Sequence, residues 1–136
     1  MKKTSVNELI NAGRFLSASK VLAESHEGLL FNLTHELVDQ LADRMCRFEI
    51  HENDFAERIA AAESVIRASI EKGILWKKEY SILDEDDAGV IYHIPIEVDR
   101  AVEINFAISD ELASKFSDTY SNFLTLMVMP SVNHAQ

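Results

Sequence analysis

The apolar pattern of this chain changes within residues 73–108, which read GILWKKEYSILDEDDAGVIYHIPIEVDRAVEINFAI. Before Gly73, apolar residues recur every three or four positions. From Ile74 to Ile108 they alternate with polar ones, and the helical spacing returns after Ser109. A period of two indicates strands, and a period near 3.6 indicates helices. The pattern therefore predicts an α+β domain with N-terminal helices, a three-stranded antiparallel β-meander and one C-terminal helix.

The alternating segment divides into three expected strands, at 74–83, 90–98 and 101–108. The acidic run that ends in Gly89 supplies the first turn, and Asp99-Arg100 supplies the second. Pro95 has no backbone N–H, so we expect a bulge or an interrupted pairing in the middle strand at that residue.

The remaining segments have helical spacing. Ser5 and Glu8 form a capping box at the start of the first helix. Gly13 predicts a kink or a tight turn. Residues 13–22 resemble a single tetratricopeptide hairpin, but such repeats need about three copies to be stable. The other expected helices span 29–48, Asp54 to Gly73, and 110–129 with Ser109 as the N-cap.

A length of 136 residues is typical of one domain. We expect 1–130 to form one compact domain and 131–136 to be a flexible tail. The apolar stripes predict a core that includes Leu37, Leu41, Ile59, Ile66, Ile104, Phe106, Phe116 and Phe123.

The formal net charge is −10, and residues 74–108 carry eight acidic and three basic side chains, or −5. A surface of this sign repels phosphate backbones, so direct nucleic-acid binding is not expected. The single cysteine favours a reducing compartment. Polar residues directly after Met-Lys-Lys argue against a signal peptide, and no apolar run is long enough to span a membrane. These features predict a soluble cytoplasmic protein.

Few residues suggest catalytic or metal chemistry. The run 84–87 lacks the ligand spacing of a calcium loop, and His35 with Asp39 supplies only two ligands. Cys46 is expected to be buried beside Met45, and nucleophile or phosphate-binding motifs are absent from the sequence. The sequence therefore predicts a protein that is not an enzyme and has no cofactor or metal site.

The leading hypothesis is a small acidic protein that binds another macromolecule, as an inhibitor, adaptor or regulator. In one form of it, carboxylates stand where phosphates would lie and block a nucleic-acid-binding protein. The partner is expected to have a basic surface, and a homodimer is a further possibility.

The expected contact residues are Asp84, Glu85, Asp86, Asp87, Glu97, Asp99, Glu103 and Trp76. Trp76 could also pack in the core with Tyr80 and Tyr92, which is the favoured interpretation of these aromatic residues. The alternative function is a small-molecule-binding or enzymatic domain with a pocket between sheet and helices.

Overall fold

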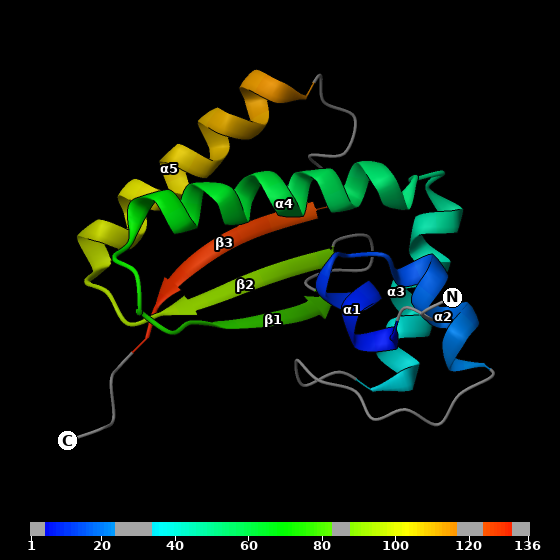
Figure 1. Ribbon diagram of the computed structural model, residues 1–136. Coiled ribbons are helices and arrows are strands. Elements are labelled where there is room, and N and C mark those ends of the chain that lie inside the picture. Colours follow the sequence, from blue (N-terminus) through cyan, green and yellow to red (C-terminus); the bar gives the residue numbers. More distant parts are fainter. Residues whose placement is uncertain (1–4, 24–33, 83–87, 117–123, 132–136) are drawn as a thin grey trace. The chain divides into compact units, whose positions relative to one another are not determined.

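The computed structural model describes residues 5–23, 34–82, 88–116 and 124–131. These residues form five helices and one three-stranded sheet, which confirms the α+β class (Figure 1). In chain order the elements are α1 (Val6–Asn11), α2 (Phe15–Leu22), α3 (His35–Arg47), α4 (Glu52–Ser69), β1 (Lys77–Ile82), β2 (Ala88–Ile94), α5 (Val98–Lys115) and β3 (Leu124–Pro130). No helix in the described ranges is long and apolar enough to cross a membrane.

The chain divides into two compact units, residues 1–59 and 60–136. In the first unit, the Ser5 side chain accepts a hydrogen bond from the Glu8 backbone N–H at 3.2 Å, which confirms the predicted cap of α1. Gly13 has a φ of 84° and lies in a tight turn between α1 and α2, as expected. α4 begins at Glu52, two residues before the predicted start. The expectation of a single domain stays a prediction.

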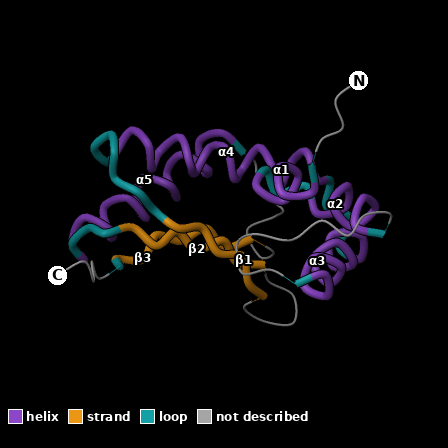
Figure 2. Tube along the Cα trace, turned by 60° about the horizontal axis from the view of Figure 1, so that its bottom comes forward, coloured by secondary structure: helices purple, strands orange, loops and turns teal. Residues whose placement is uncertain are grey.

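The second unit contains the sheet, whose strand order is β1-β2-β3. β1 and β2 form the predicted antiparallel hairpin, but β2 and β3 are parallel. The predicted meander is therefore wrong in its third strand. Residues 101–108 lie in α5, and residues 124–129, predicted to be helical, lie in β3. Figure 2 shows α5 on the same side of the sheet as the part of α4 that follows Ile59.

α5 forms because its apolar residues occupy two faces of one helix. Ala101, Ile104 and Ile108 are at most 2% exposed and pack inward, at the i, i+3, i+7 spacing of a helix. Val102 and Phe106 fall between them in the sequence but on another face, so the segment reads as alternating. The predicted turn at Asp99-Arg100 is wrong. Asp99 lies in the first turn of α5, where the helix dipole favours a carboxylate. The predicted N-cap at Ser109 is also wrong, because this residue lies inside α5.

β2 is the central strand and the most buried one. Val90, Tyr92 and Ile94 are completely buried on the face that α4 covers. β2 ends at Ile94, immediately before Pro95. The strand therefore stops at the proline, and of the two predicted outcomes it is the pairing that ends there rather than a bulge that forms. A proline cannot donate to a ladder of hydrogen bonds, which accounts for a strand shorter than the predicted 90–98.

The predicted core is confirmed at four positions: Leu41, Ile59, Ile66 and Ile104 are each at most 2% exposed. Phe106 is 67% exposed, so its prediction is wrong. Leu37 and Phe116 are only partly buried, and Phe123 lies outside the described residues.

The side chain of Asn105 satisfies the backbone of β3. Its Oδ1 accepts from the Val128 N–H at 2.7 Å, and its Nδ2 donates to the Val128 carbonyl at 3.0 Å. The Asn105 amide thus makes the two hydrogen bonds with Val128 that a neighbouring strand would make at the edge of the sheet. Unpaired edge groups are a template for unwanted strand pairing, and this contact occupies two of them.

Replacing Asn105 by leucine should leave the N–H and the carbonyl of Val128 without these partners. We expect the free energy of unfolding to fall by about 1–3 kcal/mol, the cost of unpaired buried polar groups. Denaturant unfolding measures the change. Asn105→Asp keeps the acceptor for the Val128 N–H but turns its second oxygen toward the Val128 carbonyl, so this variant should lose stability as well. An Asn105→Leu variant as stable as the unaltered protein would contradict a hydrogen-bonding role.

Candidate functional site

The structure brings three of the predicted contact residues together. Glu97 is the N-cap of α5, and Asp99 and Glu103 lie in its first two turns. Trp76 is not part of this group, because it precedes β1 and packs against Tyr92. The other four predicted residues, Asp84, Glu85, Asp86 and Asp87, lie outside the described residues.

α5 carries an apolar surface that the sequence prediction missed. Val98, Val102 and Phe106 are 63%, 47% and 67% exposed. They follow one another at intervals of four residues, so each is rotated by about 40° from the one before and all three share one side of the helix. We call these three residues the outer stripe. Contiguous apolar side chains that face solvent on a folded domain are typical of an interaction site.

Carboxylates run beside the outer stripe. Asp99, Glu103 and Asp110, here called the acidic row, are all exposed and lie next to the stripe on the side away from the buried face. Glu103 pairs with Arg100 at 2.7 Å, and Arg100 also donates to the Ser69 carbonyl at the end of α4. Within the described part of the chain, Asp99 and Asp110 have no basic side chain within ion-pair distance.

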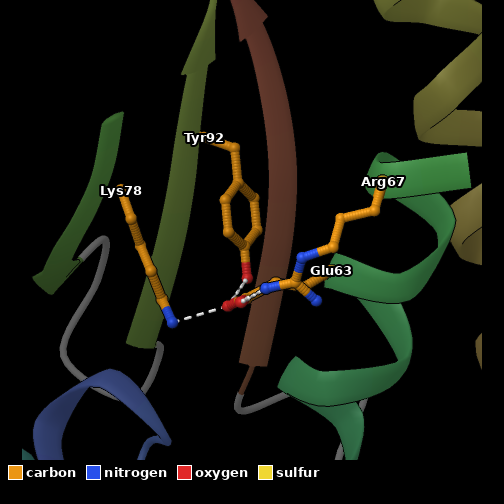
Figure 3. Close-up of polar contacts among 4 residues, drawn as sticks. All are labelled: Glu63, Arg67, Lys78 and Tyr92. Carbon is orange, nitrogen blue, oxygen red and sulfur yellow. Dashed lines mark hydrogen bonds and ion pairs between the residues drawn. The ribbon is translucent and has the colours of Figure 1, made fainter. Parts of the chain in front are cut away.

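A second polar group is buried between α4 and the sheet (Figure 3). Glu63 of α4 is 7% exposed, and three side chains form hydrogen bonds or ion pairs with its carboxylate. Lys78 Nζ of β1 lies 2.5 Å from Glu63 Oε2, and the Tyr92 hydroxyl of β2 donates to the same oxygen at 3.0 Å. Arg67, one turn further along α4, places Nη2 3.3 Å from Glu63 Oε1. The cluster ties α4 to both strands of the hairpin.

Burial controls the proton affinities in this cluster. It lowers the pKa of the Lys78 amine below its usual value, while the charge and hydrogen bond of Glu63 act in the opposite direction. It also raises the pKa of the Tyr92 and Tyr80 hydroxyls, and the negative charge of Glu63 adds to the effect. Both tyrosines therefore remain protonated well above neutral pH.

Two aromatic side chains, Trp76 and Tyr80, contact members of the buried cluster. Trp76 meets Tyr92 edge to face, with 5.4 Å between the ring centroids, and Arg67 lies 6.0 Å from the Trp76 ring. Lys78 Nζ lies 5.2 Å from the Tyr80 ring centroid. Tyr80 and Tyr92 are in the core, as favoured from the sequence, whereas Trp76 is only partly buried.

The other residues considered for metal binding or catalysis do not form one group in the structure. Asp39 accepts a hydrogen bond from the Ser19 hydroxyl at 2.7 Å, and His93 pairs with Glu79 at 2.9 Å. Cys46 is exposed, so its predicted burial is wrong. The buried stripe of α3 consists of Val38, Leu41, Ala42 and Met45, and Cys46 falls just outside it. Within the described residues, no group of three His, Cys, Asp or Glu could hold a metal ion.

Comparison of the chain with protein-family models, with curated proteins and with solved structures gave no match. The functional assignment therefore depends on α5 and on the buried cluster.

Proposed function

We propose that this protein acts by binding another protein, as an inhibitor, adaptor or regulator, through the outer stripe and the acidic row of α5. The observation that carries the proposal is the exposure of Val98, Val102 and Phe106 on a helix that already buries another apolar face. Packing among the residues that the structure describes accounts for the burial of Ile104 and Ile108, but it does not account for the exposed Phe106 side chain. A partner surface that covers the stripe supplies that reason.

The charge of α5 supports a basic partner. Residues 97–115 contain five acidic and two basic side chains, and both basic ones pair within the helix, Arg100 with Glu103 and Lys115 with Glu111. Their ion pairs leave an excess of negative charge beside the stripe. A nucleic-acid-binding protein is one class of basic partner, because carboxylates can occupy a surface that otherwise binds phosphates. The same charge disfavours direct contact with nucleic acid.

The alternative function, an enzymatic or small-molecule-binding domain, has one observation in its favour. Lys78 is an amine with a lowered pKa beside a carboxylate and a hydroxyl, a combination that amine catalysis can use. Its side chain is only 5% exposed, however, and its Nζ is held by Glu63. An amine enclosed in this way favours a structural role, so we propose binding rather than catalysis.

Affinity capture from an extract of the source cells, followed by binding measurements with the purified retained protein, tests the proposal. Phe106→Ser should weaken that binding by at least about tenfold, since a central aromatic residue carries a large share of interface energy. Its free energy of unfolding should change by less than about 0.5 kcal/mol, because the side chain is exposed.

Leu75→Ser is the matched control for this measurement. Leu75 is 87% exposed, lies before β1 and is not on α5. The control variant should bind like the unaltered protein. Retention of the same protein with equal affinity by the Phe106→Ser variant would overturn the proposal.

A further inference from the structure

We infer that the partner contacts α5 with one amphipathic helix that presents lysine or arginine along one side. The inference rests on the proposed function and specifies the partner's structure and charge. It follows from the spacing of the exposed residues on α5, from the one-sided position of the acidic row, and from the contact that occupies the other side of the stripe.

The exposed face of α5 continues beyond the outer stripe with the spacing of a helix-packing seam. Ser109 and Ala113 are exposed and follow Phe106 on the same side of the helix. The series Val102, Phe106, Ser109, Ala113 has intervals of four, three and four residues, as in a coiled-coil seam. From Val98 to Ala113 the seam is about 22 Å long. One partner helix of about four turns covers this length. It would meet the large side chains of α5 at one end of the seam and could approach α5 more closely at the other end, where the residues are small.

The acidic row lies on one side of the seam only. On the other side, Asn105 is engaged with the backbone of Val128 in β3. A partner helix on the seam therefore meets β3 on one flank and carboxylates on the other. Basic side chains are favourable on the acidic flank alone, so the charges also fix which way the partner helix is rotated.

A second copy of this chain fits the seam less well. Two copies would bring together two helices that each carry an excess of acidic residues, and each chain has a net charge of −10. Like charges at an interface oppose association. The observations thus favour a different, basic chain over a homodimer.

The test uses the full chain and two synthetic amphipathic peptides as probes. Both peptides have leucine at the seam positions, and one peptide has lysine along a single flank where the other has glutamate. Calorimetry should show binding of the lysine peptide and none of the glutamate peptide. Phe106→Ser should weaken binding of the lysine peptide by at least about tenfold, and Leu75→Ser should leave it unchanged.

Charge is tested by neutralising the acidic row in one variant, Asp99→Asn, Glu103→Gln and Asp110→Asn. The control removes three exposed acidic charges from α3, α4 and the segment after α4: Glu36→Gln, Glu57→Gln and Glu71→Gln. At low salt, the acidic-row variant should bind the lysine peptide about tenfold more weakly than the control variant, and its binding should depend less on salt.

Three outcomes overturn the inference. Equal loss of affinity in the two charge variants would show that the net charge of the protein, and not the position of the acidic row, attracts the peptide. Lysine-peptide binding that is indifferent to Phe106→Ser would place the contact elsewhere. A dimer in sedimentation that Phe106→Ser dissociates would assign the seam to a second copy. If the captured natural partner still depends on Phe106 in any of these cases, the proposed function stands and only the partner's structure is wrong.

Discussion

Replacing Gly13 by alanine should lower the free energy of unfolding by about 2–4 kcal/mol. Gly13 has a φ of 84°, which is unfavourable for any residue with a Cβ. A Cβ at this position would lie 2.5 Å from Ile59 Cδ1 and 3.0 Å from Phe55 Cδ1. Both neighbours are only 2% exposed, so they have little room to move away. Backbone strain and overpacking therefore add at the same residue, and denaturant unfolding measures their sum.

Gly73→Ala separates the two contributions. Gly73 has a φ of 94°, but a Cβ there would meet no atom within 4 Å. This variant should lose only the backbone contribution, about 1 kcal/mol. The difference between the two variants is then the cost of crowding Ile59 and Phe55. A Gly13→Ala variant no less stable than Gly73→Ala would show that the turn adjusts without cost.

Local signals in the sequence predicted local structure well. The cap at Ser5, the turn at Gly13 and the hairpin of β1 and β2 each depend on residues that are close in the chain. Short-range sterics and hydrogen bonding determine such features, so they can be recognised without knowledge of the rest of the fold.

The third strand could not be predicted in the same way. β3 pairs in parallel with β2 across a connection that contains all of α5. Its sequence, LTLMVMP, is a short apolar run, which is compatible with a buried strand or with a helix. α5 ends at Lys115 with neither glycine nor proline to mark the boundary, so the helical pattern was extended through β3. Parallel pairing depends on the tertiary fold, which no local pattern contains.

The error at α5 has a different cause, and it bears on function. The alternation of Val102, Ile104, Phe106 and Ile108 imitates a strand because the helix is apolar on two sides. A helix that only covers a sheet needs one apolar side. The feature that misled the secondary-structure prediction is thus the outer stripe itself, the same surface that we propose as the contact with the partner.

The buried cluster was recognisable from the sequence, although it was missed. Glu63 lies four residues after Ile59 and three before Ile66, which puts a carboxylate on the buried stripe of α4. Lys78 lies two residues before Tyr80 in β1, so the two side chains share the inward face of that strand. Opposite charges at inward positions of two elements predict a buried ion pair, since neither charge is stable there alone.

Glu63→Gln should have the largest effect on stability of the variants considered, about 3–5 kcal/mol at pH 7. It removes the negative charge that Lys78 faces, and the Lys78 side chain is only 5% exposed. Arg67 contributes little to this loss because its side chain is 64% exposed. Glu57→Gln is the matched control: this carboxylate also lies on α4 but is exposed, and its replacement should cost less than about 0.5 kcal/mol.

A second substitution should recover part of the lost stability. In the double variant Glu63→Gln with Lys78→Met, the unpaired amine is replaced by an apolar side chain of similar length. Breaking a buried pair is costly mainly because one charge remains, so the double variant should be more stable than Glu63→Gln alone. A double variant less stable than the single one would show that Lys78 stabilises the fold through contacts other than Glu63.

The pH dependence gives an independent check of the same charge. The folded protein holds the Lys78 pKa below its ordinary 10.5, so between these two values the unfolded chain binds more protons and stability rises with pH. Glu63→Gln removes an interaction that raises the Lys78 pKa, so this pKa is lower in the folded variant. The pH range over which stability rises therefore extends further toward neutral pH in the variant. The deficit of the variant should therefore shrink between pH 7 and about pH 9.5 in denaturant unfolding. Tyr80 and Tyr92 act with the opposite sign, because their raised pKa values make stability fall above pH 10. Below that pH their contribution is constant, so a deficit that does not shrink would mean that Lys78 is not the charge left unpaired.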